Sequence, residues 1–159
     1  MRFTLSAALC AFLVTSLPAH ASDLVGRASV IDGDTLEIHG ERIRIEGIDA
    51  PESRQTCHDR ATAADVRCGQ RAALWLSDLI GAGTVTCVEV GRDRYKRVLA
   101  HCSVAGQDVG ASMVEAGWAL AYVRYSREYE AQEAKAREAK SGIWQWEFVA
   151  PWDWRRGAR

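Results

Sequence analysis

Apolar and polar residues alternate in several stretches of the chain, with the period of two that is typical of strands with one buried face. In the first part of the chain, Asp32-Gly33 and His39-Gly40 interrupt the alternation, and such pairs favour tight turns between strands. Later, two β-rich stretches flank a short polar turn and predict a hairpin. We therefore expect strands at residues 24–31, 34–38, 41–46, 84–90 and 98–104.

Other stretches have the residue spacing of helices, namely residues 69–80, 109–116 and 126–141. In the first of them, Ala72 and Leu76 fall on one face. In the last, Ser126 is the expected N-cap, and Glu133 and Arg137 form a pair four residues apart. A glycine follows each stretch, as is common after the last turn of a helix.

The order of these elements predicts a small α+β domain. Strands come first, followed by a polar loop at residues 52–67, a helix, a hairpin and two further helices. A five-stranded β-barrel with helices packed around it fits that order. The chain shows no internal repeat or linker that would divide it into several domains.

Residues 1–21 have the pattern of a secretory signal peptide. Arg2 is followed by an apolar run at residues 5–17 and by Ala19-His20-Ala21, a small-residue cleavage site. The apolar run is too short for a membrane-spanning helix. We expect cleavage after Ala21, export to the periplasm or the medium, and no stable association with a membrane.

The exported chain would keep the cysteines Cys57, Cys68, Cys87 and Cys102, an even number that favours disulfides in an oxidising compartment. Their spacing favours the pairs 57–68 and 87–102, because the first pair brackets a polar loop and the second flanks the hairpin turn symmetrically. A zinc site is the alternative, since His58 lies beside a cysteine. No second close Cys or His pair completes a set of four ligands.

Carboxylates gather where the first strands end. Asp34 follows the turn that begins at Asp32, and Asp49 and Glu52 flank Pro51. If these ends converge, the repulsion between the carboxylates must be relieved, and a hard divalent cation with oxygen ligands would relieve it. Protonation or separation in space would relieve it as well, and Asp32 itself is more simply explained as a turn residue.

Two arginines add a second kind of chemistry. Arg44 lies on the strand face opposite Ile43 and Ile45, and Arg97 follows the polar turn of the hairpin. A pair of guanidinium groups can grip a phosphodiester and neutralise the extra charge of its five-coordinate transition state. Alternatively, each arginine is a solvated charge that protects a strand edge from aggregation.

Together, the segments "VIDGDT", "RIEGIDAPE" and "DRYKR" resemble the staphylococcal nuclease (thermonuclease) family, in the same order and with similar separations. The resemblance covers residues 25–144 and includes "WALAYV" and "SGIW". It implies an OB-type β-barrel with three helices and Ca²⁺-dependent hydrolysis of phosphodiester bonds in DNA or RNA, with 3′-phosphate products. The implied nuclease-like domain spans residues 22–144.

The resemblance also implies a metal site and a base. Asp34 and Asp49 would be calcium ligands, and the backbone carbonyl of Ala50 would be a third ligand. Glu52 would be the general base that activates water. In this chain, Ala50 replaces a threonine of the family, which matters little if only its carbonyl is used.

Arginines and tyrosines fill the remaining implied roles. Arg44 and Arg97 would bind the phosphate and stabilise the transition state. The residues implied to hold the terminal phosphate and base of the substrate are Arg94, Tyr95 and Tyr122. Lys96 stands where the founding nuclease has a glycine, so it adds a positive charge and could alter the turn that aims Arg97.

The charge of the chain differs from that of the strongly basic founding enzyme. With 20 Lys and Arg against 21 Asp and Glu, the net charge is −1, and loss of Arg2 with the signal peptide makes it −2. Non-specific binding of nucleic acid by a generally basic surface is therefore excluded. A nucleic acid must instead be bound locally by arginines or through a metal.

The C-terminal tail, residues 145–159, is rich in tryptophan and arginine. Indoles that pack the tail onto the domain are the favoured explanation, and a clamp that stacks on single-stranded nucleic acid is the alternative. The sequence as a whole predicts an exported, monomeric nuclease acting on single-stranded DNA or RNA. The alternative is a non-catalytic nucleic-acid-binding OB module on the same scaffold.

Overall fold

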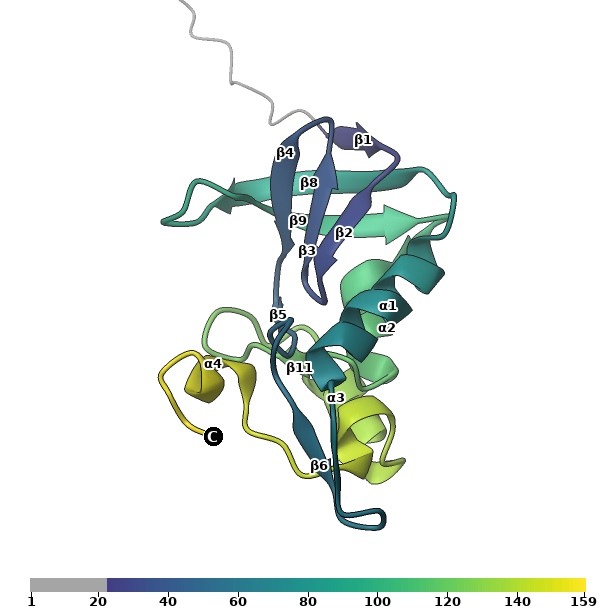
Figure 1. Cartoon of the computed structure of the whole chain (residues 1–159). Coiled ribbons are helices and arrows are strands. Elements are labelled where there is room, and N and C mark those ends of the chain that lie inside the picture. The colour runs from purple at the N-terminus through teal and green to yellow at the C-terminus, as the bar shows by residue number, and fades with distance from the viewer. Residues whose placement is uncertain (1–22) are drawn as a thin grey trace, which may run out of the picture.

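The computed structural model describes residues 23–159, so the expected signal peptide lies outside the described residues. The larger sheet forms one end of the molecule, and the helices and the C-terminal segment form the other, as Figure 1 shows. Within the described part of the chain, no helix has the length and apolar character needed to span a bilayer.

The main sheet has the strand order β1-β8-β9-β4-β3-β2, with β10 paired to β9. Its members are β1 (Leu24–Gly26), β2 (Ser29–Asp32), β3 (Thr35–Ile38), β4 (Glu41–Ile45), β8 (Val85–Arg92), β9 (Val98–Val104) and β10 (Gln107–Asp108). The pairing of β4 with β9 is parallel and the other pairings are antiparallel. The sheet is therefore mixed.

The first predicted strand is divided into β1 and β2, which lie at opposite ends of the strand order. Only Arg27 and Ala28 separate these two strands in the chain. Two residues span only about 7 Å. The sheet must therefore curl until its edges meet, as in an OB barrel. The predicted α+β class and OB-like arrangement are confirmed, and the five predicted strands account for every member of this sheet except β10.

Alternate residues of the curled sheet point inward and form the core. They are almost completely buried, as the alternation in the sequence predicts. The fully buried members on the strands are Leu36, Ile38, Ile43, Val85, Cys87, Val98 and Ala100. Helix α1 (Cys68–Ile80) packs against β2 and adds Ala72 and Leu76, both completely buried, to this core.

The remaining helices are α2 (Val109–Glu115), α3 (Glu130–Glu138), the 3₁₀ turn η1 (Gly142–Gln145) and α4 (Pro151–Trp154). The prediction that the third helix starts at Ser126 is wrong, because α3 begins only at Glu130. The hydroxyl of Ser126 accepts a hydrogen bond from the backbone N–H of Glu128, which forms a local turn in place of a helix cap. Tyr129 is buried and donates its hydroxyl hydrogen bond to Asp108.

The segment predicted as a polar loop contains a small hairpin of β6 (Cys57–Asp59) and β7 (Ala64–Val66), so this prediction is wrong in part. A disulfide joins Cys57 to Cys68 at the start of α1, and a second joins Cys87 to Cys102, which lie directly opposite each other on β8 and β9. These are the pairs that the spacing favours.

The tail returns along the domain. Trp146 packs on Trp118 with ring centres 6.1 Å apart, and Trp144 meets Phe148 edge-to-face at 5.2 Å. Further along, Trp152 lies flat against Tyr122, with an interplanar angle of 8°. The tryptophans thus hold the tail against the domain and carry α4 to the junction of β5 (Ile48–Asp49) and β11 (Leu120–Ala121), as Figure 1 shows.

Helix α1 starts in close contact with the backbone around Glu52. A Cβ atom added to Gly69 would overlap the carbonyl oxygen of Glu52. The start of the helix therefore fixes the position of the loop that carries Glu52, and any side chain at position 69 would push this loop away.

We expect Gly69→Ala to lower the free energy of unfolding by about 2 kcal/mol or more, because the added methyl group has no space. At most helical positions the same change stabilises a protein by up to about 1 kcal/mol. Urea denaturation measures the difference. Gly91→Ala is the control, since its Cβ would meet no atom within 4 Å. A neutral or stabilising effect of Gly69→Ala would contradict the close contact.

Candidate active site

A cleft of about 790 Å³ opens between the curled sheet, the loop that joins β8 to β9, and the C-terminal segment. Most of the residues singled out from the sequence line it: Asp34, Arg44, Ala50, Glu52, Arg94, Tyr95, Arg97 and Tyr122. Asp49 has no exposed surface and hydrogen-bonds to two of the arginines of the cleft. The structure therefore brings the predicted residues to one place.

The turn between β2 and β3 places Asp34. The carboxylate of Asp32 accepts a hydrogen bond from the backbone N–H of Asp34 at 3.1 Å, so Asp32 acts as a turn residue. A Cβ on Gly33 would come within 2.6 Å of Ala50 and 2.9 Å of Ala72. This close packing brings Asp34 beside Ala50, whose N–H donates to its carboxylate at 3.2 Å.

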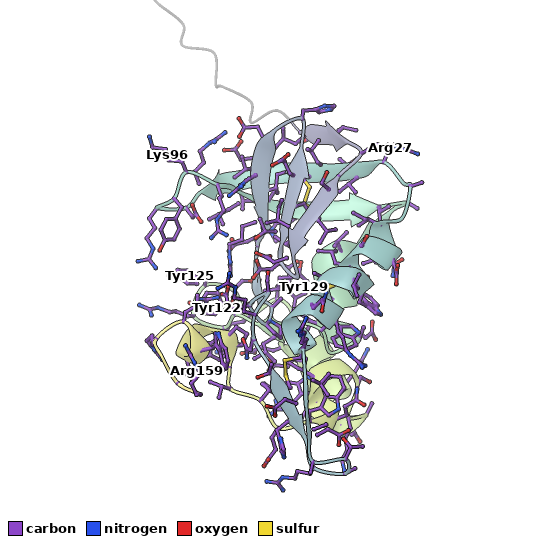
Figure 2. All side chains as sticks on the ribbon, in the orientation of Figure 1. Arg27, Lys96, Tyr122, Tyr125, Tyr129 and Arg159 are labelled. Carbon is purple, nitrogen blue, oxygen red and sulfur yellow. A yellow bond between two sulfur atoms is a disulfide. The ribbon has the colours of Figure 1, made fainter. Side chains whose placement is uncertain are left out.

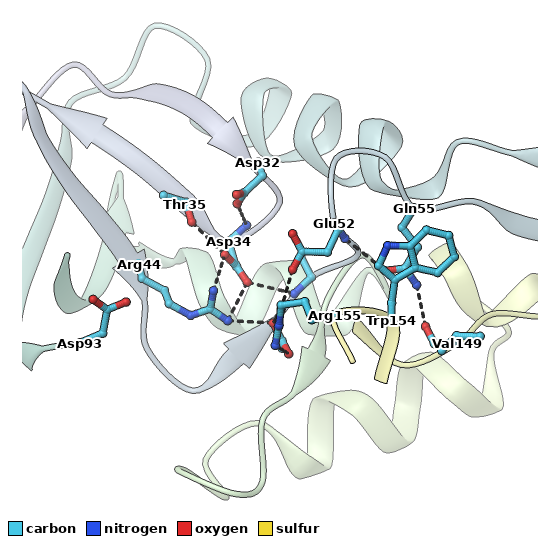
Figure 3. Close-up of polar contacts among 12 residues, drawn as sticks. Asp32, Asp34, Thr35, Arg44, Glu52, Gln55, Asp93, Val149, Trp154 and Arg155 are labelled. Carbon is cyan, nitrogen blue, oxygen red and sulfur yellow. Dashed lines mark hydrogen bonds and ion pairs between the residues drawn. The ribbon is translucent and has the colours of Figure 1, made fainter. Parts of the chain in front are cut away.

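Arg44 lies between two buried carboxylates. Its guanidinium donates to Asp34 at 3.2 Å and to Asp49 at 2.8 Å (Figure 3). Asp34 is 3% exposed and Asp49 is 0% exposed, so neither charge is solvated by bulk water. A single positive charge thus faces two carboxylates, so part of their negative charge stays unneutralised by Arg44.

The electrostatics of these groups reflect their burial. Burial raises the pKa of Asp34 to about 6, although the charge of Arg44 opposes the shift. Burial also raises the pKa of Asp49, against the hydrogen bond from Arg155. For Arg44, burial disfavours the charge, but the two neighbouring carboxylates outweigh it and raise its pKa. Such shifts are common where function places like charges together.

Arg97 is held from the loop between β8 and β9. The carboxylate of Asp93 accepts hydrogen bonds from the Arg97 side chain at 2.8 Å and from its backbone N–H at 3.0 Å. Another Arg97 nitrogen lies 3.4 Å from the hydroxyl of Thr35, which in turn donates to Asp34 at 2.9 Å. Burial would raise the pKa of Asp93, but the hydrogen bonds from Arg97 outweigh it and lower the pKa.

Lys96, at the tip of this loop in Figure 2, has a φ of 66°, in the left-handed region that favours glycine. Its backbone N–H nevertheless donates to the carbonyl of Asp93 at 2.9 Å. The lysine therefore carries some backbone strain, and Arg97 still hydrogen-bonds to Asp93 and reaches Thr35.

Glu52 lies on a loop whose backbone is held by hydrogen bonds through Gln55. The backbone N–H of Glu52 donates to the side chain of Gln55 at 3.2 Å, and Gln55 donates to the carbonyl of Val149 at 2.6 Å (Figure 3). Gln55 has no exposed surface, whereas the Glu52 side chain is 37% exposed. The backbone of Glu52 is thus fixed while its carboxylate faces the cleft.

Arg155 is the functional candidate that the sequence pattern did not single out. It follows α4 and points back to the carboxylates, as Figure 3 shows. Its guanidinium donates to both oxygens of Asp49, at 2.9 and 2.6 Å, and to Glu52 at 2.7 Å. The hydrogen bonds to Asp49 raise the pKa of Arg155 above its ordinary value. The density of tryptophan and arginine in the tail was the available signal.

Aromatic residues border the cleft. Tyr122 and Tyr125 lie close together in Figure 2 and meet edge-to-face at 4.9 Å. Tyr95 is 68% exposed, and the guanidinium groups of Arg94 and Arg97 lie 5.2 and 5.7 Å from its ring centre. These groups offer flat surfaces and positive charge to a ligand, but they do not contact the buried carboxylates directly.

Within residues 23–159, no three or more His, Cys, Asp or Glu side chains converge in an arrangement that could hold a metal ion. The implied calcium set is smaller, with the carboxylates of Asp34 and Asp49 and one backbone carbonyl. Its donors are all oxygen atoms, which suits a hard cation. A cationic group, Arg155, already contacts both oxygens of Asp49. The donor chemistry therefore fits a divalent cation if that guanidinium gives way.

The family described as Staphylococcal nuclease homologue matches residues 42–146. The chain is 40% identical over 144 residues to the succinoglycan biosynthesis protein ExoI of Rhizobium meliloti (strain 1021), covering 89% of this chain and 75% of that protein. It is 32% identical over 165 residues to a micrococcal nuclease of Shigella flexneri, covering 92% and 88%. An uncharacterized endonuclease of Escherichia coli is 33% identical over 151 residues, with 89% and 92% covered.

The chain therefore belongs to the staphylococcal nuclease family. The family expected from the sequence motifs is confirmed, and with it the class of enzyme, a nuclease that hydrolyses phosphodiester bonds. The match begins at Arg42, after Asp34 in the chain, and it includes Arg44, Asp49, Glu52 and Arg97.

The raised pKa of Asp34 predicts a pH dependence of stability. Its pKa is about 6 in the folded protein against 3.8 for an ordinary aspartate, so the folded state binds this proton more tightly than the unfolded chain. Without metal, the contribution of Asp34 to stability is therefore greatest at low pH and falls as the pH rises through 6.

We expect the free energy of unfolding of the wild type, relative to Asp34→Asn, to fall by roughly 2–3 kcal/mol from about pH 4 to about pH 7. Urea denaturation of both proteins in the presence of a chelator measures this difference. A difference that does not change with pH would show that Asp34 is ionised at no cost in the folded protein.

Proposed function

We propose that this protein is an exported, Ca²⁺-dependent nuclease that cleaves single-stranded DNA or RNA, or exposed duplex ends, and leaves 3′-phosphates. The observation that carries the proposal is a continuous hydrogen-bonded row of charged side chains, joined through one hydroxyl, in and beneath the cleft. The row runs through Asp93, Arg97, Thr35, Asp34, Arg44, Asp49, Arg155 and Glu52. Such a row supplies both the anionic ligands for a cation and the guanidinium groups for a phosphate.

Asp34, Asp49 and the carbonyl of Ala50 would hold the cation. When bound, Ca²⁺ supplies positive charge that polarises the phosphate and neutralises the buried carboxylates. Before binding, the hydrogen bonds from Thr35 and Arg44 already fix the position of the Asp34 carboxylate. The protein therefore orients one ligand in advance, which lowers the entropic cost of binding.

Glu52 would take the proton from the attacking water. Its carboxylate is partly exposed at the edge of the cleft, so water can reach it, and its backbone is held by Gln55. A general base needs this combination of a fixed position and access to water. The proton would be accepted at a carboxylate oxygen, and the Glu52 oxygen that now contacts Arg155 is within the same cleft.

Arg44 and Arg97 would bind the phosphate oxygens. Arg44 is held by Asp34 and Asp49, and Arg97 by Asp93, so both guanidinium groups are oriented before a substrate arrives. Preorganised donors stabilise the charge of the five-coordinate transition state without further rearrangement. One of them can also donate to the leaving 5′-oxygen.

At the rim, Arg94, Tyr95 and Tyr122 would hold the terminal phosphate and base of the substrate. The exposed ring of Tyr95, flanked by two guanidinium groups, suits stacking of an unpaired base. Because the net charge is negative, binding depends on these few groups, and we expect a shallow dependence of affinity on salt.

The two disulfides fit an oxidising compartment, which supports export after removal of residues 1–21. We further propose that the exported protein acts as a monomer, since the residues implied to bind metal and phosphate meet within one chain.

We expect Glu52→Gln and Arg97→Ala each to lower turnover by about 10²–10³-fold, because one removes the base and the other a donor to the transition state. Turnover is measured on a single-stranded DNA and a matched RNA, with Ca²⁺, with Mg²⁺ and with chelator, and the product ends are identified. Circular dichroism and thermal melting report whether each variant is folded.

The matched controls are Glu130→Gln and Arg127→Ala, an exposed ion pair outside the cleft that should leave turnover unchanged. Near-normal rates in both cleft variants would refute the assignment of these roles. Retained binding of nucleic acid without any cleavage by the folded wild type would instead identify a non-catalytic binding module.

A further inference from the structure

Arg155 comes from the far end of the chain, yet it is bound to the centre of the site. It is 106 residues from Asp49 in sequence, and its guanidinium donates to both oxygens of that carboxylate, at 2.9 and 2.6 Å. The first of these nitrogens also donates to Glu52 at 2.7 Å. This bidentate geometry is that of the strongest arginine–carboxylate pairs.

We propose that Arg155 is an internal cation that competes with the divalent metal ion for Asp49 and, while bound there, holds Glu52 as well. This inference rests on the proposed calcium site. It assigns to a residue of the tail the control of metal affinity: the metal binds fully only when the Arg155 side chain has left the carboxylates.

The competition follows from the number of free oxygen positions on Asp49. Arg44 and Arg155 both donate to one oxygen, and Arg155 alone donates to the other. These hydrogen bonds occupy three of the roughly four lone-pair positions of the carboxylate. Asp49 is also 0% exposed, so little of it stays open to a metal ion while Arg155 is bound. A divalent cation at the same carboxylate would also be repelled by the guanidinium, and the repulsion is stronger than in bulk water because Asp49 has no exposed surface.

The same contacts show how the side chain can leave. Trp152 is anchored by its stack on Tyr122, and Pro151 is buried, so α4 stays in place. Arg155 lies after α4, and its side chain is 36% exposed. Rotation of this one long side chain into the cleft therefore frees Asp49 and Glu52 without displacement of the tail.

Arg156 provides a control within the same turn. Its side chain is 68% exposed and pairs with Asp153, which does not line the cleft. Arg156→Gln removes the same charge from the same segment as Arg155→Gln, but it leaves the carboxylates of the site untouched.

The test is titration calorimetry of the full exported chain with Ca²⁺ in the absence of nucleic acid. We expect Arg155→Gln to bind Ca²⁺ at least about tenfold more tightly than the wild type, and Arg156→Gln to bind like the wild type. Arg155→Lys, which keeps the charge but lacks the planar fork that pairs with both carboxylate oxygens, should lie between the wild type and Arg155→Gln.

Thermal melting gives a second readout that does not depend on activity. In chelator, Arg155→Gln should melt below the wild type, because the buried Asp49 loses a counter-charge. Added Ca²⁺ should raise the melting temperature of Arg155→Gln more than that of the wild type, since stabilisation by a ligand grows with the logarithm of its affinity. If Arg155→Gln does not fold in chelator, the same comparison is made with Arg155→Lys.

Equal or weaker Ca²⁺ binding by Arg155→Gln would overturn the competition and make Arg155 an organiser of the ligand set. Absence of Ca²⁺ binding by every variant would refute the calcium site itself, and the competition with it. Tighter binding by Arg155→Gln in a protein that cleaves no nucleic acid would uphold the competition while the proposed nuclease reaction fails.

Discussion

The site depends on one electrostatic constraint: two carboxylates, Asp34 and Asp49, are buried side by side in a small domain. Unpaired buried charges cost several kcal/mol each, so the surrounding structure must supply positive charge. Arg44 supplies part of it by bridging both groups. The raised pKa of Asp34 indicates that this compensation is incomplete. An arginine from the tail and a divalent cation are two ways to complete it.

The two carboxylates are brought together because the main sheet curls until its edge strands meet. The short connection between β1 and β2 forces the sheet to curl, and the turn after β2 then packs on Ala50 and α1 through Gly33. Helix α1 fixes the adjacent loop that carries Glu52. The carboxylates therefore sit on rigid elements, whereas the phosphate-binding candidates Arg94 and Tyr95 sit on a loop between strands. Rigid ligands and an adaptable rim are a common division in binding sites.

Local patterns in the sequence predicted local structure well. Alternation gave the strands, and the motif "RIEGIDAPE" led to Arg44, Asp49 and Glu52, which the cleft brings together. Contacts between distant segments were not predictable in this way. No local pattern shows that Arg155 reaches Asp49, or that the carboxylate of Asp93 orients Arg97 through two hydrogen bonds. The predicted start of α3 was wrong because serine is a common N-cap residue. In this structure, however, the hydroxyl of Ser126 accepts a hydrogen bond within a local turn.

The disulfide between Cys57 and Cys68 ties the two ends of the segment that lies between the Glu52 loop and α1. Closing a loop of this size is worth about 3 kcal/mol in the chain-entropy model, a large share of the stability of a small domain. A newly made copy with free thiols would lack that share, and the loss would fall on the segment next to Glu52, the proposed general base. In the proposed exported protein, this part of the stability would be gained only after the thiols are oxidised, in the compartment where the protein would meet its substrate.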